Sequence, residues 1–149
     1  MPTKAPNKFA VIALIGGVLL AALFALLLLN GSQGPSVGSQ ATTINARIST
    51  LQTVANAQQK HLSENAIAEA NATLNSSLTT MTTDLSKLVS GTKPDKTASA
   101  KESSYQSKLS STLESAYQRG TLDRTYTVQM TYELTVLRGM LVKLKNNST

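Results

Sequence analysis

Three side chains that lie close together in the sequence, His61, Ser63 and Glu64, are of the types that form a catalytic triad. In a triad the base must reach the serine hydroxyl while the acid orients the base, so the three side chains converge on one point. Side chains two and three positions apart on a helix do not converge in this way, and no glycine-rich turn presents Ser63. We therefore interpret His61 as a solvent-facing helix residue, and we predict no catalytic residues.

The acidic residues are too scattered to predict a metal site. They show neither the Glu-x-x-His pairs of a di-metal bundle nor the spacing of a calcium-binding loop. The eight residues are Glu64, Glu69, Asp84, Asp95, Glu102, Glu114, Asp123 and Glu133. Cysteine is absent, which excludes disulfides and thiolate ligands, and there is no phosphate-binding glycine loop. We predict that the protein is not an enzyme and has no cofactor and no metal ion.

The net charge of +6 is spread along the chain rather than gathered in a basic run. Proteins that bind DNA or RNA concentrate Lys and Arg on one face or in one segment. The distribution therefore predicts no nucleic-acid partner. An excess of this size favours acidic surfaces only weakly.

A stretch of 21 residues, 9–29, contains no charge, no proline and no hydrogen-bonding side chain. A helix of this length spans about 30 Å, the thickness of the hydrocarbon core of a bilayer, and satisfies its own backbone hydrogen bonds. We predict a transmembrane helix preceded by a short tail, residues 1–8. Small residues recur at every fourth position of this helix, which is typical of close helix association but also of the composition of such segments. They are Ala13, Gly17, Ala21 and Ala25.

The charges that flank this segment predict its orientation. Lys4 and Lys8 precede it, and the first charged residue after it is Arg47. By the positive-inside rule the N-terminus lies in the cytoplasm and the rest of the chain lies outside the cell membrane. A cleaved signal peptide is the alternative, since small residues at 32–34 offer a possible cleavage site. The apolar run, however, is longer than that of a usual signal peptide.

Residues 30–40 are rich in Gly and Ser and predict a flexible linker. Beyond them, apolar residues recur at spacings of three and four, the pattern of amphipathic helices. The pattern runs from residue 41 to 62 and resumes from 67 to 88, so we predict a break at 63–65. Gly91 and Pro94 predict a turn at 90–97. A third helix follows at about 98–119 and ends at Gly120.

Residues 126–136 fit two different predictions. Apolar and polar residues alternate there, many of them β-branched or aromatic, which favours a strand that would have to pair with another chain. The same residues place Tyr126, Met130 and Leu134 on one helix face, which continues to Leu144, and they place Val128 and Tyr132 beside that face. Because no other segment offers a partner strand, we predict a helix. Residues 41–146 then form an all-α domain, a bundle of three or four antiparallel helices with the last helix in the middle.

These features predict a single-pass membrane protein that presents a helical bundle outside the membrane. We expect it to bind a protein partner or a second copy of itself, as a structural or accessory subunit. The alternative is a ligand-binding or sensing module with a groove between its helices. The candidate groove residues, which could equally lie at the edge of the core, are Tyr105, Tyr117, Tyr126 and Tyr132.

Overall fold

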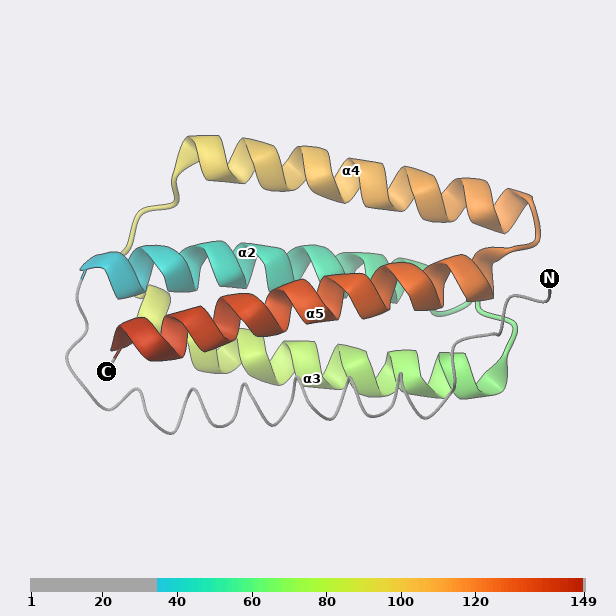
Figure 1. Cartoon of the computed structure of the whole chain (residues 1–149), viewed down its shortest axis with the longest axis horizontal. Coiled ribbons are helices and arrows are strands. Elements are labelled where there is room, and N and C mark those ends of the chain that lie inside the picture. Colours follow the sequence, from blue (N-terminus) through green and yellow to red (C-terminus); the bar gives the residue numbers. More distant parts are fainter. Residues whose placement is uncertain (1–34, 149) are drawn as a thin grey trace.

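The computed structural model describes residues 35–148, which form four α-helices. In chain order these are α2 (Pro35–Gln58), α3 (Asn65–Val89), α4 (Lys96–Gln118) and α5 (Leu122–Ser148). Successive helices run in opposite directions along one long axis (Figure 1). The prediction of a helical bundle is confirmed for this part of the chain. No strand is present within it, so residues 126–136 are helical and belong to α5.

The centre of the bundle is α2, which packs against α3, α4 and α5. α3 and α4 lie on opposite sides of it, while α5 packs against α2 and α4 and contacts α3 through polar side chains (Figure 1). The prediction that the last helix occupies the middle was therefore wrong. Buried side chains on α2 include Ala41 and Ala55, whose small size allows neighbouring helices to approach closely, and between them Ile44, Ile48, Leu51 and Val54.

α2 begins earlier than the composition of its first turns predicts. Residues 35–40, which we assigned to a flexible linker, are its first residues. Pro35 suits the first helical position because its fixed backbone angle is already helical and its missing N–H is not needed there. Val37 is buried, and a Cβ at Gly38 would lie only 2.6 Å from the Thr92 hydroxyl. Glycine at position 38 thus lets α2 pack against the connection between α3 and α4.

The apolar faces predicted from spacing are the faces that are buried. On α3 the buried residues include Leu74, Leu78, Met81, Leu85 and Leu88. α4 buries only Leu109, Leu113 and Ala116, fewer than the other helices, as its sparse apolar pattern predicts. It is consequently the helix with the least apolar attachment to the core.

The predicted turn at 90–97 agrees with the structure, whereas α2 ends at Gln58, before the predicted break at 63–65. α2 and α3 are separated at residues 59–64, and α3 and α4 at 90–95. Gly91 and Gly120 have φ values of 84° and 69°, which L-residues with a side chain rarely adopt. Asp95 caps α4 by accepting a hydrogen bond of 2.9 Å from the Thr97 amide.

α3 is capped from a distant part of the chain. Its N-cap residue, Glu64, makes no side-chain cap of its own. The carboxylate of Asp123, in the first turn of α5, instead accepts hydrogen bonds from the Ser63 amide at 3.0 Å and the Glu64 amide at 2.7 Å. A carboxylate in this position satisfies amides that the helix leaves unpaired, and it interacts favourably with the helix dipole. The start of α3 is thereby tied to the start of α5.

None of the four described helices combines the length and the hydrophobicity needed to cross a bilayer. The predicted tail at 1–8 and the predicted transmembrane helix at 9–29, with its small residues Ala13, Gly17, Ala21 and Ala25, lie outside the described residues. Their membrane assignment stays a prediction.

Removal of the Asp123 carboxylate tests the tertiary cap. We expect Asp123→Ala to lower the free energy of unfolding by about 1 kcal/mol, the usual effect of losing an N-cap acceptor. Thermal unfolding of the full-length protein in mild detergent, followed by circular dichroism, measures the change. Asp123→Asn, which keeps an oxygen acceptor, is the matched control and should lose less. Equal stability of Asp123→Ala and the unchanged protein would contradict the cap.

Candidate functional site

The four candidate tyrosines occupy different environments. Tyr126 is 3% exposed and lies in the core, whereas Tyr132, on the same helix, is 64% exposed. Tyr105 is half-buried beneath Arg47. Tyr117 is exposed and its ring lies 4.5 Å from that of His61, centre to centre. The structure places the four side chains with separate partners, and a common ligand groove between them stays a prediction.

His61 differs from its predicted setting. It lies in the connection after α2 rather than on a helix, and it is partly buried against Tyr117. Ser63 follows in the same connection, where its amide is held by Asp123. The contact joins the α2–α3 connection to the end of α4, so packing accounts for the position of the histidine.

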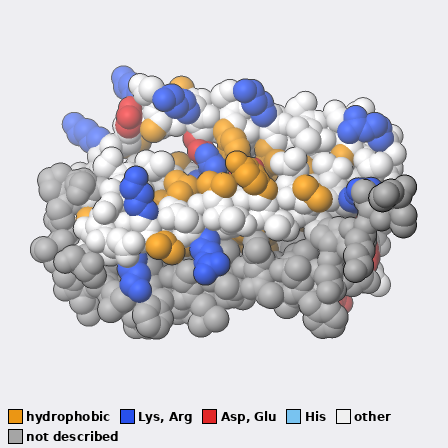
Figure 2. Space-filling model, viewed as in Figure 1, with side chains coloured by type: hydrophobic (Ala, Val, Ile, Leu, Met, Phe, Trp, Pro, Cys, Tyr) orange, Lys and Arg blue, Asp and Glu red, His pale blue; other side chains and the backbone are white. Residues whose placement is uncertain are grey.

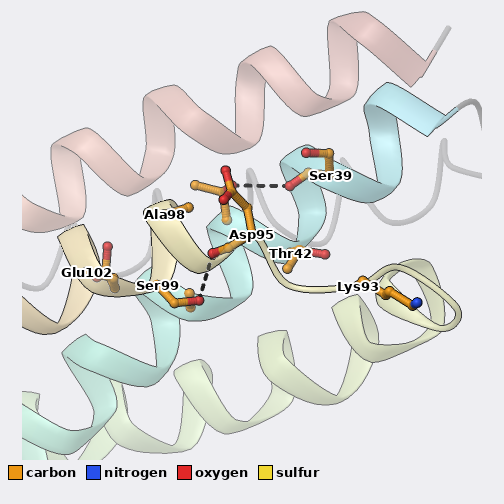
Figure 3. A pocket seen from close by; sticks show the side chains of 9 residues that line it. Ser39, Thr42, Lys93, Asp95, Ala98, Ser99 and Glu102 are labelled. Carbon is orange, nitrogen blue, oxygen red and sulfur yellow. Dashed lines mark hydrogen bonds between the residues drawn. The ribbon is translucent and has the colours of Figure 1, made fainter.

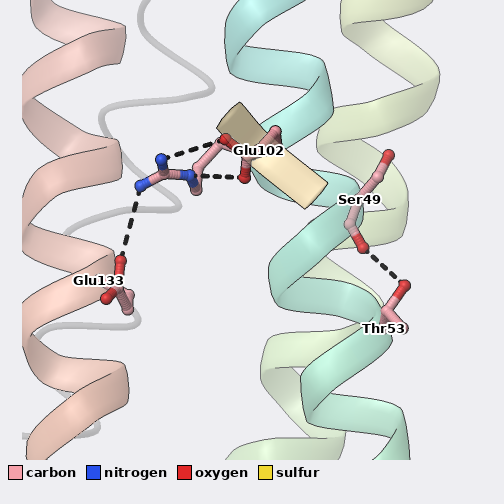
Figure 4. A network of polar contacts seen from close by, with 5 residues as sticks. Ser49, Thr53, Glu102 and Glu133 are labelled. Carbon is pink, nitrogen blue, oxygen red and sulfur yellow. Dashed lines mark hydrogen bonds and ion pairs between the residues drawn. The ribbon is translucent and has the colours of Figure 1, made fainter. Parts of the chain in front are cut away.

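An ion cluster joins α2, α4 and α5 inside the bundle (Figure 4). Arg47 on α2 donates from Nε to Glu102 Oε1 at 2.8 Å and from Nη2 to Glu102 Oε2 at 3.1 Å. Its Nη1 lies 3.7 Å from Oε2 of Glu133 on α5. The guanidinium carbon is 3.9 Å from the centre of the Tyr105 ring. One cation therefore faces two carboxylates and the face of an aromatic ring, which is a favourable position for arginine.

The charges of this cluster are largely removed from water. The side chain of Glu133 is 4% exposed, and its only cation within the cluster is Arg47. Burial by itself lowers the pKa of Arg47, but the hydrogen bonds that Arg47 donates to Glu102 and the negative charge of Glu102 outweigh burial and raise that pKa. Burial, together with the nearby Glu133 carboxylate, raises the pKa of Tyr105. These shifts do not favour proton exchange by Arg47 or Tyr105 near neutral pH, and the geometry is that of a structural cluster.

Replacement of Arg47 tests this cluster. Arg47→Met removes the cation and leaves the buried Glu133 carboxylate without a counter-ion, which costs about 3–5 kcal/mol in comparable buried pairs. We expect a large fall in the thermal unfolding temperature of the full-length protein. Lys108→Met, at an exposed position of α4, is the control and should change stability by no more than about 0.5 kcal/mol.

A second substitution separates charge from packing. In Arg47→Met/Glu133→Gln the uncompensated carboxylate is gone, so part of the lost stability should return. If the double variant were no more stable than Arg47→Met, the loss would come from packing of the arginine side chain rather than from its charge.

A second buried polar network joins α2, α3 and α5. Asn71 on α3 is 2% exposed, and its side-chain nitrogen donates to the Ala55 carbonyl at 2.9 Å and to Gln59 Oε1 at 2.7 Å. Its side-chain oxygen accepts a hydrogen bond from the hydroxyl of Tyr126. The polar atoms of the Asn71 side chain are thus paired, as a buried amide requires. This pairing explains why an asparagine stands on the otherwise apolar face of α3.

Tyr126→Phe tests this network. The variant leaves the buried Asn71 oxygen without its donor, and we expect a loss of about 1–3 kcal/mol at neutral pH. Burial raises the pKa of Tyr126 above its ordinary value of 10.0. The stabilisation by the neutral phenol is therefore complete below pH 10 and declines at higher pH, because the unfolded tyrosine ionises first. Denaturation across this pH range should show the difference between the two proteins narrowing above pH 10; a constant difference would contradict the linkage.

A small cleft of about 70 Å³ lies between the first turns of α2 and α4 (Figure 3). Its polar groups are engaged in helix capping and local contacts. Asp95 caps α4, Ser99 donates to the Asp95 carbonyl at 3.0 Å, and Thr42 donates to the Gly38 carbonyl at 2.9 Å. Ligand pockets usually measure several hundred Å³, and none of the four tyrosines lines this cleft. The cleft is too small for an organic ligand of ordinary size.

No group of three or more His, Asp or Glu side chains within residues 35–148 is arranged to hold a metal ion. Glu102 and Glu133 are two carboxylates that share one partner, Arg47. An arginine at that point occupies the position that a cation would take.

The most distinctive surface feature is an exposed apolar stripe on α5. Val128, Tyr132 and Val142 are 52%, 64% and 43% exposed, and they are three of the four large apolar residues exposed among the described residues. Thr135 and Gly139, also exposed, lie between them. Spacings of four, three, four and three place all five on one helix face. We call these five residues the outer stripe.

The outer stripe lies opposite the buried face of α5. On the side that Figure 2 shows, hydrophobic side chains gather along the middle, and Lys and Arg side chains are distributed around them. The exposed charged residues of α5 are Arg124, Arg138 and Lys143, all of them basic. An apolar stripe with a polar rim is typical of protein interaction surfaces.

Sequence reasoning located the apolar residues of α5 but missed the outer stripe. It placed Val128 and Tyr132 beside the buried face, because an apolar residue is expected inside. The available signal was a second apolar series at alternating spacings of four and three, running through Thr135 and Gly139 to Val142. Two such series on one helix indicate two contact surfaces. The ion cluster gave no such signal, because its residues are 55 or more positions apart from Arg47.

Comparisons of the chain with protein-family models, with curated proteins and with solved structures find no match. Residues 35–148 define a four-helix domain with an exposed apolar face on its last helix.

Proposed function

We propose that the protein is a single-pass membrane protein that displays its helical domain outside the cell membrane and acts, without catalysis, by binding a protein partner. It would serve as a structural or accessory subunit. The membrane assignment rests on the uncharged run at 9–29 and on the basic residues that precede it. The binding assignment rests on one observation, the outer stripe of α5.

Exposure of this stripe carries a cost that binding would remove. Val128, Tyr132 and Val142 each leave a large part of their apolar surface in water, and a serine or lysine at these positions would avoid it. The helix does not need these side chains for its own packing, because its core face is supplied by Met130, Leu134 and others. A protein partner that covers the outer stripe would bury this second apolar face of α5.

Charged substitutions in the stripe test this proposal. Val128→Asp/Tyr132→Asp places two carboxylates in the proposed contact, and we expect the affinity for the partner to fall by about 100-fold or more, as for a central contact residue. Sedimentation of the full-length protein, extracted in mild detergent from the membranes in which it is expressed, reports the mass of the complex. The variant should sediment as a single chain, and the unchanged protein as a larger assembly.

The matched control is Ser103→Asp/Ser107→Asp on α4. These two serines are exposed, lie one helical turn apart like Val128 and Tyr132, and accept the same added charge. The control variant should retain the larger assembly. Identical sedimentation of both variants and the unchanged protein would exclude the outer stripe as the binding surface.

A further inference from the structure

The outer stripe is complementary to itself, and we infer that α5 of one chain docks antiparallel against α5 of a second copy. This inference rests on the proposed function and identifies the partner. The first observation concerns Gly139, which lies inside α5 at the centre of an exposed face. Glycine destabilises a helix interior relative to alanine, so its presence there calls for a reason.

Contacts among the described residues of one chain give no such reason. Gly38 is required by the close approach of Thr92, and Gly91 and Gly120 have positive φ angles. A Cβ at Gly139 would meet no atom within 4 Å, and its φ is not positive. Gly139 therefore leaves a gap in the stripe that no side chain of residues 35–148 fills. The largest side chain of the same stripe, Tyr132, lies two helical turns away.

The spacing of the stripe matches this gap to that side chain. When two copies of α5 lie antiparallel with Thr135 facing Thr135, Val128 of each copy lies opposite Val142 of the other. Within one residue, Tyr132 then lies opposite Gly139. The Tyr132 ring of each copy thus meets Gly139 of the other, so this contact occurs twice. Val128 and Val142 pair at both ends of the interface. This is the reciprocal pattern of a two-fold interface, in which each contact occurs twice.

The charges select the same arrangement. In the antiparallel register Arg138 lies level with the uncharged Tyr132 of the other copy rather than with a second Arg138. Arg124 lies level with the uncharged Asn146 of the other copy. A parallel pairing would place each basic residue against the same basic residue of the other chain. It would also place Tyr132 against Tyr132 and Gly139 against Gly139. Both shape and charge therefore oppose the parallel arrangement.

The symmetry is compatible with anchoring in one membrane. The two-fold axis of such a pair is perpendicular to α5. Residue 35 of one chain and residue 35 of the other therefore have the same position along this two-fold axis. Both copies can thus extend towards one bilayer. Confinement of both chains to one bilayer raises the concentration at which one outer stripe meets the other. A contact of moderate area is then enough to hold the pair together.

Cysteine crosslinking of the full-length protein in lipid vesicles tests the register directly, since the natural chain contains no cysteine. Thr135→Cys lies on the two-fold axis, and we expect most of this variant to form a disulfide-linked dimer under mild oxidation. Ser107→Cys, exposed on α4, is the control for random collision and should stay monomeric. Thr135→Cys crosslinking no better than Ser107→Cys would overturn the inference.

A mixed experiment distinguishes the two orientations. Val128→Cys and Val142→Cys, carrying tags of different size and expressed together, should form the mixed disulfide in preference to either disulfide with itself. Preferential linkage of Val128→Cys to Val128→Cys would instead show a parallel pair and overturn the antiparallel register.

Gly139→Leu tests the fit of Tyr132 into the gap. Leucine is apolar and favours helices, so only the filled space can weaken pairing, and we expect Thr135→Cys crosslinking to fall by about tenfold in this background. Unchanged crosslinking would overturn the role assigned to Gly139, and thermal unfolding of the variant confirms that it is folded. Loss of the larger assembly in Val128→Asp/Tyr132→Asp without any Thr135→Cys crosslink would end the self-pairing inference while leaving partner binding in place.

Discussion

The rotation of α5 about its own axis decides which of its faces is buried, and three polar contacts on the buried face help to determine that rotation. Asp123 caps the start of α3, Tyr126 donates to Asn71, and Glu133 faces Arg47. Hydrogen bonds and ion pairs are directional, and removal of either partner leaves a buried group unsatisfied. Burial of apolar surface favours the same rotation, because the buried face of α5 carries more large apolar residues than its outer face. The outward direction of the outer stripe follows from both kinds of contact.

The position of α2 shows how charge and packing act together. Within Pro35–Gln58 the only charged residue is Arg47, and its charge is neutralised inside the bundle by Glu102 and Glu133. A helix with so little charge can be surrounded on three sides without burying unpaired ions. α4, with many Ser and Lys residues and few large apolar ones, suits a peripheral place in the bundle. The distribution of charge among the helices is consequently a better guide to the centre of this bundle than the width of an apolar face.

The surface of the bundle is unusual in its use of hydroxyl groups. Many exposed Thr and Ser side chains donate to the carbonyl four residues earlier in the same helix, as Thr53, Thr73 and Thr112 do. Such bonds satisfy the hydroxyls but contribute little to helix stability, because Ser and Thr are modest helix formers. The helices therefore depend on tertiary contacts. In such a domain, an additional contact along α5 would stabilise the helix as well as the assembly.

The sequence by itself determined the helical class of the domain, the approximate helix ends and most of the core. Amphipathic spacing and turn residues are local properties, readable in Leu74 to Leu88 or at Gly91 and Gly120, and the structure agrees with them. Only the tertiary structure decided that residues 35–40 are helical, that α2 is central, and that Val128 and Tyr132 face outward. Each of these depends on contacts between residues far apart in the chain, such as Gly38 with Thr92 or Arg47 with Glu133. Spacing along α5 indicates its buried face, but whether the apolar residues outside that face are covered depends on the neighbouring helices that the fold brings to it.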